Sequence, residues 1–238
     1  MIAEGIQKLI DLAKVEVHEV GLRKFASRAV HEIEPKRIEP LTVHSLQAVV
    51  DFFGGSETVN LDVSPDEVVV HVVDPCMVTV LSGVADETYR KREHYLTAKR
   101  VFSEFEFGRW FEQDEMTIKL MTQFEETETQ NKIIKAISGL KVSADATLSD
   151  DGVSQELTVR KGASRVETIE IKNPIKLKPV RTFLEVEQVE APYVLRVKDF
   201  DNVPAVAIFE AGDQWKNTAI TRIKAWLANE IGGVKILG

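Results

Sequence analysis

Cysteine is nearly absent from this sequence, since Cys76 is the only one among 238 residues. A single cysteine excludes a disulfide within the chain and any metal site built from cysteines alone, and it suits a reducing compartment. Long apolar runs are also absent, because no stretch approaches eighteen consecutive apolar residues, and no membrane span is expected. No basic region followed by an apolar stretch opens the chain, so no secretory signal is expected.

Positive charge is scarce relative to negative charge. The 30 lysines and arginines are outnumbered by 38 aspartates and glutamates, which gives a net charge of -8 and a pI of about 5.3. Broad, sequence-independent binding to a nucleic-acid backbone requires a basic face, so the acidic balance disfavours it. A local basic patch remains compatible with this composition.

Signatures of established catalytic sites are missing as well. The sequence contains no G-x-S-x-G, no phosphate-binding P-loop and no G-x-G-x-x-G. Cys76 follows Pro75 among apolar residues, which favours a buried, inert thiol. The histidines never lie three or four residues apart, so no helix presents two of them on one face: His18, His31, His44, His71 and His94. We therefore expect no catalytic residue, metal site or cofactor, while a hydrolase based on carboxylates stays an open alternative.

The first half of the chain is predicted to mix short helices with a small sheet. Apolar residues at helical spacing predict helices over 2–14 and 43–53, the second ended by Gly54-Gly55, and residues 15–33 between them are strand-like. Alternating or wholly apolar runs predict three strands, which are 58–63, 67–73 and 76–82.

Two further helices are predicted before the middle of the chain. They cover residues 112–124 and 128–139, and Thr127 and Gln130 have the spacing of a capping box at the start of the second.

The second half is predicted to be rich in strands. Apolar and polar residues alternate from Val142 to Leu148, which predicts a strand. Asp151-Gly152 is a hairpin signal, and residues 153–159 are predicted to form the returning strand. A strand over 164–171 changes parity between Val166 and Ile169, which predicts a bulge. The remaining expected strands are 182–187, 192–198, 204–210 and 234–237. A terminal helix capped by Asp213 and ended by Gly232-Gly233 closes the half.

These elements predict an α+β protein. The N-terminal half is mixed, with short helices and a small sheet, and the C-terminal half is an antiparallel meander closed by a terminal helix. The single plausible boundary lies near Leu140, which separates a mixed α/β region over 1–140 from a β-rich region over 141–238. One continuous domain is the alternative.

A basic segment over residues 90–100 is the best binding candidate in the sequence. Arg90 and Arg92 could form charge-assisted pairs with phosphate oxygens, and Tyr95 could stack on a base. The alternative is a solvated surface on which these cations balance nearby glutamates. The aromatic run over 102–111 that follows is expected to belong to the core, with a stacking platform as the other interpretation.

Three segments together resemble a family of uncharacterised phage and prophage proteins, to which the prophage YfdQ-like proteins are more distantly related. They are Tyr95 to Trp110 with its Phe105-Glu106-Phe107-Gly108-Arg109-Trp110, Asp150 to Gln155, and Val180 to Gln188. The resemblance implies a phage or prophage origin and a cytoplasmic setting in an infected or lysogenic bacterium. It brings no agreed activity and no catalytic residue.

With that origin, the first hypothesis is a non-enzymatic counter-defence protein. It would be a homo-oligomer that sequesters a small anionic, nucleotide-like ligand between subunits, with Arg90, Arg92, Tyr95 and Arg181 as ligand-binding residues. The second hypothesis is an accessory protein of phage DNA recombination or replication that binds single-stranded DNA or a partner protein. The third is a nucleotide-cleaving enzyme, and direct inhibition of a host enzyme also stays open.

Overall fold

The chain forms two compact units, Met1–Ile38 and Glu39–Gly238. The computed structural model describes residues 4–6, 11, 14, 17–20, 23–26, 39–54, 67–83, 92–138, 154–161, 165–200, 203–210 and 212–238. In the first unit, β1 (Val17–Val20) and β2 (Arg23–Ala26) form an antiparallel hairpin, as the strand-like pattern over 15–33 predicted. Residues 4–6 and 11, which fall in the predicted helix over 2–14, are helical.

A five-stranded sheet in the second unit has the order β13-β4-β5-β6-β3. The hairpin of β4 (Val68–Asp74) and β5 (Met77–Ser82) confirms the strands predicted over 67–73 and 76–82. β13 (Lys235–Leu237) confirms the strand predicted over 234–237. β6 (His94–Lys99) pairs with β5 although the sequence predicted no strand there. β3 (Leu41–Val43) and β13 form the two edges by parallel pairing. The strand predicted over 58–63 lies outside the described residues.

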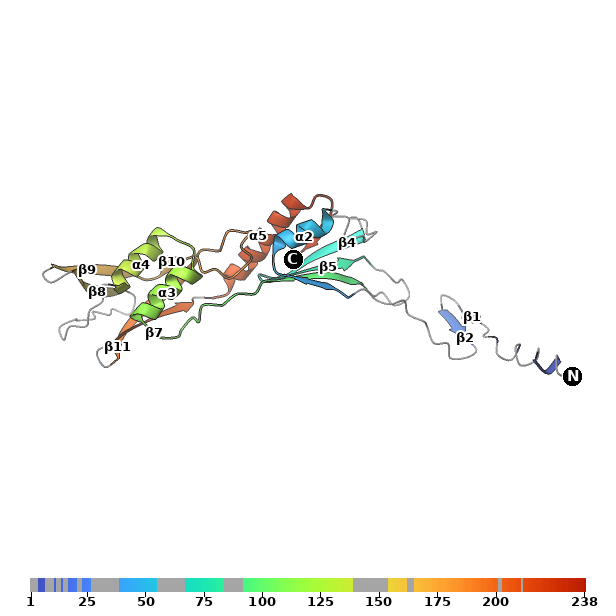
Figure 1. Ribbon diagram of the computed structural model, residues 1–238, viewed down its shortest axis with the longest axis horizontal. Coiled ribbons are helices and arrows are strands. Elements are labelled where there is room, and N and C mark those ends of the chain that lie inside the picture. Colours follow the sequence, from blue (N-terminus) through green and yellow to red (C-terminus); the bar gives the residue numbers. More distant parts are fainter. Residues whose placement is uncertain are drawn as a thin grey trace. The chain divides into compact units, whose positions relative to one another are not determined.

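Two helices, α2 (Leu46–Phe53) and α5 (Gln214–Glu230), pack on the five-stranded sheet (Figure 1). Their buried residues join the valines of β4 and β5 in one hydrophobic cluster. The prediction that Val43 opens the first of these helices was wrong. Val43 pairs with Ala98 in β3, and the helix begins after Ser45, whose hydroxyl accepts a hydrogen bond from the Ala48 N–H at 3.2 Å.

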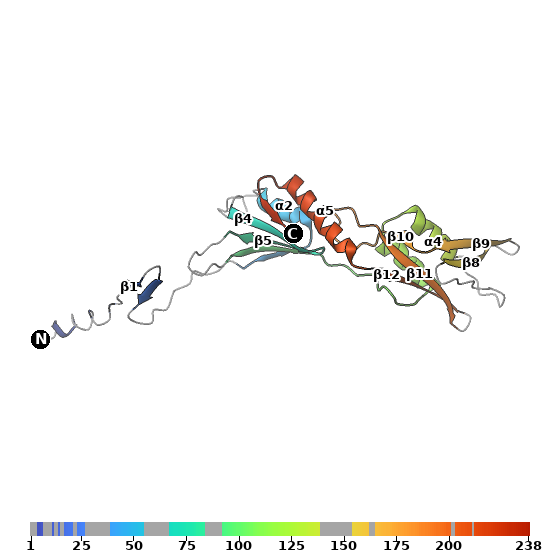
Figure 2. The same cartoon turned by 180° about the vertical axis from the view of Figure 1, so that it is seen from behind.

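A four-stranded antiparallel sheet has the order β10-β11-β12-β7. Its strands are β10 (Ile175–Leu177), β11 (Ala191–Phe200), β12 (Val203–Glu210) and β7 (Phe111–Glu112). The consecutive pairing from β10 to β12 confirms the predicted meander. Figure 2 shows the long β11–β12 hairpin from the side opposite to Figure 1.

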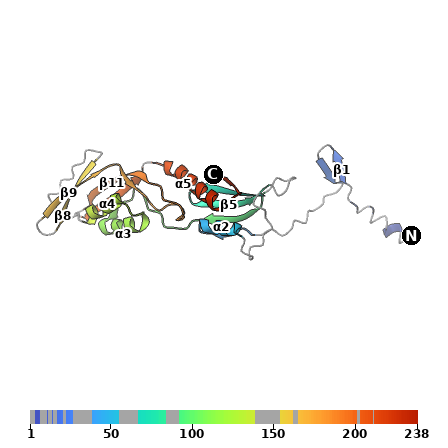
Figure 3. The ribbon, with the colours of Figure 1, turned by 90° about the horizontal axis from the view of Figure 1, so that it is seen from above.

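Two helices, α3 (Gln113–Gln123) and α4 (Glu128–Ser138), cover one face of the four-stranded sheet. They bury with it a hydrophobic cluster that contains four aromatic side chains and is here termed the aromatic cluster. The predicted capping box is confirmed. Thr127 Oγ1 accepts from the Gln130 N–H at 3.1 Å, and Gln130 Oε1 accepts from the Thr127 N–H at 3.2 Å. Next to these helices, β8 (Ser154–Lys161) and β9 (Arg165–Lys172) form a separate two-stranded ribbon (Figure 3).

Three local predictions were wrong. No bulge interrupts β9, because its register with β8 runs unbroken from Ser154–Lys172 to Lys161–Arg165. Residues 182–187 form a turn and not a strand, since the buried side chain of Gln188 occupies the backbone groups that a sheet would use. Asp213 precedes α5 but makes no side-chain capping bond, and its carboxylate pairs with Lys216. The hairpin signal at Asp151-Gly152 and the strand expected over 142–148 lie outside the described residues.

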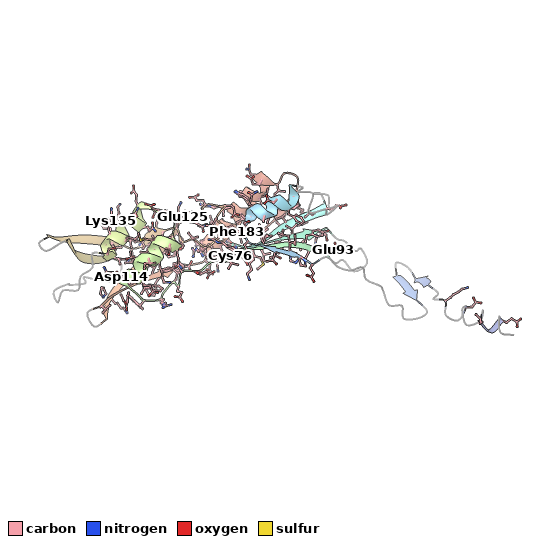
Figure 4. All side chains as sticks on the ribbon, in the orientation of Figure 1. Cys76, Glu93, Asp114, Glu125, Lys135 and Phe183 are labelled. Carbon is pink, nitrogen blue, oxygen red and sulfur yellow. The ribbon has the colours of Figure 1, made fainter. Side chains whose placement is uncertain are left out.

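A segment over residues 178–188, here termed the connecting segment, contacts both hydrophobic clusters. It forms a β-bridge from Pro179 to Phe124 beside the aromatic cluster, and the Thr182 hydroxyl donates to the Pro75 carbonyl at the end of β4. Phe183, labelled in Figure 4, is buried in the cluster of the five-stranded sheet. Strands from both sides of Leu140 pair in each sheet, so the α+β fold of this unit draws on both halves of the chain.

Candidate functional site

The basic segment over 90–100 lies partly in strand β6. Arg90 falls outside the described residues. Arg92 is exposed, and its Nη1 donates to the Ser82 carbonyl oxygen at 2.9 Å, which fastens it to the end of β5. This contact uses one of the five N–H donors of the guanidinium, so the remaining donors can still face an anion.

Tyr95 does not offer a free ring on this surface. Its ring stacks against Phe52 of α2 with centroids 6.4 Å apart and an interplanar angle of 28°. Burial of the hydroxyl raises the pKa of Tyr95, and the neighbouring Glu93 carboxylate raises it further. One face of the ring therefore belongs to the packing of α2 on the sheet.

Arg181 lies at the opposite end of the five-stranded sheet from Arg92 and Tyr95. Its carbonyl oxygen accepts a hydrogen bond from the Cys76 thiol at 3.3 Å, immediately before β5 begins. Arg92 donates its hydrogen bond to Ser82, the last of the 6 residues of β5. At about 3.3 Å per residue, the two anchor points are roughly 20 Å apart, so a single small ligand does not reach both.

The side chain of Arg181 is enclosed by aromatic rings. Its guanidinium carbon lies 3.6 Å from the ring centroid of Trp215, 5.7 Å from that of Phe107 and 5.8 Å from that of Tyr193. Phe107 and Tyr193 are themselves stacked, with centroids 5.1 Å apart and an interplanar angle of 10°. We call Arg181, Phe107, Tyr193 and Trp215 the arginine cluster.

Glu210 at the end of β12 neutralises one end of this guanidinium. Arg181 Nη1 lies 2.5 Å from Glu210 Oε1, and the side chains are 9% and 28% exposed. A buried cation without a partner would be costly, so this pair is the reason that an arginine can occupy the site.

Four polar atoms of the arginine cluster are nevertheless buried without a well-aligned hydrogen bond to the described residues, although the Arg181 guanidinium lies close enough to the Tyr193 hydroxyl to favour its ionised form. They are Nε and Nη2 of Arg181, the hydroxyl of Tyr193 and Nε1 of Trp215. Burial raises the pKa of Tyr193, outweighing the opposite effect of Arg181, so the phenol stays protonated at neutral pH. Buried polar groups normally find a partner, and a group of unpartnered donors around one cation is the arrangement expected of an anion site.

Cys76 is not activated for nucleophilic chemistry. Burial and the nearby carboxylates of Asp74 and Glu104 raise the pKa of its thiol from 9.0 to about 11, so the reactive thiolate is scarce at neutral pH. Within the described part of the chain, no group of three histidine, cysteine or carboxylate side chains could hold a metal ion. No helix there is long and apolar enough to cross a membrane.

Sequence reasoning named Arg181 but missed the residues around it. Phe107 had been assigned to the core as part of the aromatic run, and Tyr193, Glu210 and Trp215 lie in three other elements. Arg181 and Phe107 lie in two of the segments that carry the family resemblance, which are Val180 to Gln188 and Phe105 to Trp110. No family model, curated protein or solved structure matches the chain.

Proposed function

We propose that this chain is a non-enzymatic binding protein that sequesters a small anionic, nucleotide-like ligand. The observation that supports the proposal is the unpartnered Nε and Nη2 edge of Arg181 inside its aromatic enclosure. In keeping with the resemblance, the protein would be phage-encoded and would act as a counter-defence factor in the bacterial cytoplasm.

The chemistry of this edge favours a phosphate group. The Nε and Nη2 donors of a guanidinium point in parallel and match two oxygens of one phosphate or carboxylate. The Tyr193 hydroxyl and the Trp215 indole N–H add neutral donors beside them. Tyr193 and Arg181 each cover one face of the Phe107 and Trp215 rings, and a nucleobase would stack on the remaining apolar faces.

Access to these donors requires a local movement, because all four atoms are buried. Phe107 is half-buried and lies in the segment before β7, and the next residue, Gly108, has a φ of 78°. Displacement of the Phe107 ring would expose the guanidinium edge without breaking a strand. Glu210 would remain on Nη1 and limit the net charge of the occupied site.

The proposed homo-oligomer is supported by surfaces that a second copy could cover. The edge strands β3 and β13 of the five-stranded sheet leave one side of each backbone without a strand partner among the described residues. Val101 and Leu184 are 73% and 74% exposed. Native mass spectrometry of gently purified protein tests the assembly, and a monomer at micromolar concentration would contradict it.

Calorimetric titration with a panel of cyclic and linear nucleotides tests the ligand. We expect binding that is lost in Arg181→Met and strongly weakened in Arg181→Lys, because lysine keeps the charge but lacks the two-donor edge. Arg92→Met is the matched control and should bind like the wild type. Absence of binding at millimolar nucleotide concentration would contradict the proposal.

Analysis of the nucleotides after the titration separates binding from catalysis. Intact nucleotide recovered from the complex, with and without added Mg²⁺ or Mn²⁺, supports sequestration. Cleavage products would replace the proposal with the nucleotide-cleaving enzyme considered from the sequence.

A further inference from the structure

The carboxylate of Glu210 sets the charge that a ligand of the arginine cluster meets. Arg181 contributes one positive charge, and Glu210 contributes one negative charge at 2.5 Å from Arg181 Nη1. Attraction between a site and an anion grows with the positive charge of the site. Here the single cation already has a partner, so the formal charge of the pair is zero before any ligand binds.

The two charges of this pair differ in their contact with solvent. The side chain of Arg181 is 9% exposed, and that of Glu210 is 28% exposed. Water therefore solvates part of the Glu210 carboxylate, whereas the guanidinium depends on its protein neighbours and on a ligand. The buried Nε and Nη2 atoms of Arg181 lack a well-aligned hydrogen bond, while Nη1 serves Glu210. A ligand at the Nε–Nη2 edge would thus share one guanidinium with Glu210.

The segments that carry the rings of the cluster supply no further cation to the ligand. Charged residues lie close to two of the rings in sequence, but each is paired with a neighbour of opposite sign. These pairs are Glu106 with Arg109, near Phe107, and Asp213 with Lys216, near Trp215. Tyr193 has no charged residue next to it in sequence. A ligand therefore meets one full positive charge and two neutral donors, the Tyr193 hydroxyl and the Trp215 indole N–H.

Phosphate groups differ in the negative charge that they bring to such a site. A phosphodiester carries one negative charge, whereas a terminal phosphate carries about -1.5 to -2 at neutral pH. Both groups present oxygens that match the two parallel donors of the guanidinium edge. The repulsion from Glu210 and the cost of burying uncompensated charge both rise with the charge of the ligand. The hydrogen-bond geometry thus accepts either group, while the charge balance favours the diester.

We propose that the arginine cluster selects phosphodiesters over terminal phosphates, and that Glu210 is the residue that determines this specificity. The inference rests on the proposed function, because it concerns the same site and narrows its ligand class. Cyclic nucleotides and internucleotide linkages are diesters. Linear nucleoside monophosphates, diphosphates and triphosphates end in a phosphate of higher charge and are then poor ligands.

Calorimetric titration of the full chain tests this selectivity with three forms of each common ribonucleotide. They are the cyclic monophosphate, the linear monophosphate and the methyl ester of the linear monophosphate. The methyl ester is a linear diester, so it separates the effect of charge from that of ring closure. We expect the methyl ester to bind about 10-fold or more tightly than the linear monophosphate with the same base. The cyclic form should share this advantage.

Substitution of Glu210 tests its role in the selectivity. Glu210→Gln removes the negative charge at nearly constant size, so the affinity for the linear monophosphate should rise by about 10-fold or more and the preference for the diester should shrink. Glu210→Asp keeps the charge and should keep the preference. Glu190→Gln is the matched control, since Glu190 also pairs with a cation, Lys176 at 3.5 Å, but on the surface. Thermal unfolding confirms that each variant is folded, and the wild-type comparison stays decisive if Glu210→Gln is not.

The outcomes separate this inference from the proposed function. A wild-type protein that binds the linear monophosphate as tightly as its methyl ester, with both lost in Arg181→Met, would overturn the inference and leave the proposed function intact. A diester preference that persists in folded Glu210→Gln would also overturn it, because the charge of Glu210 would not be its cause. Absence of binding for every form would contradict the proposed function and the inference together.

Discussion

The two large sheets differ in the number of aromatic side chains that they fully bury. In the five-stranded sheet, β4 and β5 contribute five buried valines, and the helices above them add mainly aliphatic residues. The four-stranded sheet buries Phe105, Phe111, Phe124 and Tyr193, two of which come from segments outside any strand or helix. Valine side chains pack well on a pleated surface and carry no atom that requires a hydrogen bond. Buried tyrosine and tryptophan side chains carry polar atoms that require hydrogen-bond partners. The unpartnered donors of the arginine cluster consequently lie beside the aromatic core.

Truncating one core leucine in each sheet tests whether the two cores are equally important for stability. Leu195→Ala in β11 and Leu96→Ala in β6 should each lower the free energy of unfolding by about 2–5 kcal/mol, because both side chains are buried. Urea denaturation followed by circular dichroism measures the change. Leu184→Ala, at a position 74% exposed, is the control and should stay within about 0.5 kcal/mol. Two separate transitions in either core variant would show that the sheets unfold independently.

The connecting segment joins the two cores, and Gln188 organises it. Its buried Oε1 accepts from the backbone N–H groups of Arg181 at 2.9 Å and Thr182 at 3.1 Å. Gln188→Ala leaves these groups without a partner, which should cost about 1–3 kcal/mol in urea denaturation. Gln47→Ala, which removes an exposed bond to Asp51, is the matched control and should have little effect. An equal loss in both variants would contradict the role assigned to Gln188.

The same segment shows where sequence reasoning reached its limit. The sequence predicted a strand over 182–187, yet Phe183 and Val186 are both buried in a turn. The side chain of Gln188, a few residues further along the segment, holds this conformation through backbone hydrogen bonds, and periodicity holds no information about such a bond. The β4–β5 hairpin was predictable because its apolar run and its Asp74-Pro75 turn are local features.

The candidate site was predictable only in part for a related reason. Arg181 was named as a ligand-binding residue, but its partners come from the loop before β7, from β11, from the end of β12 and from the start of α5. Each of these residues is ordinary in its own segment. Only tertiary packing brings them together, and no spacing in the sequence records it.

Raising the pH should destabilise the protein through groups near both sheets. Burial raises the pKa of Tyr193 above its ordinary value of 10.0 and that of Cys76 from 9.0 to about 11. Above pH 9 the unfolded chain loses these protons while the folded chain keeps them, so the unfolded state binds fewer protons and stability falls as pH rises. Thermal unfolding between pH 8 and 10.5 should show this decline. Tyr193→Phe should make it shallower, and an unchanged slope would contradict the assignment.

The unreactive state of Cys76 is checked separately by thiol labelling. At pH 8 a pKa of about 11 leaves about 0.1% thiolate, against about 10% for the ordinary pKa of 9.0. We expect labelling by a disulfide reagent about 100-fold slower in the folded protein than in urea. Equal rates would show that the thiol is activated or exposed.

The smallest expected effects concern the starts of α2 and α5, the two helices on the five-stranded sheet, which differ in their capping bonds. Ser45 caps α2 through its hydroxyl, so Ser45→Ala should lower the free energy of unfolding by about 1 kcal/mol. Asp213 stands before α5 without a side-chain capping bond, and its pair with Lys216 is exposed. Asp213→Ala should therefore change stability by less than about 0.5 kcal/mol, because exposed ion pairs contribute little. A larger loss for Asp213 than for Ser45 in parallel urea titrations would mean that sequence spacing, and not the observed bond, had identified the cap.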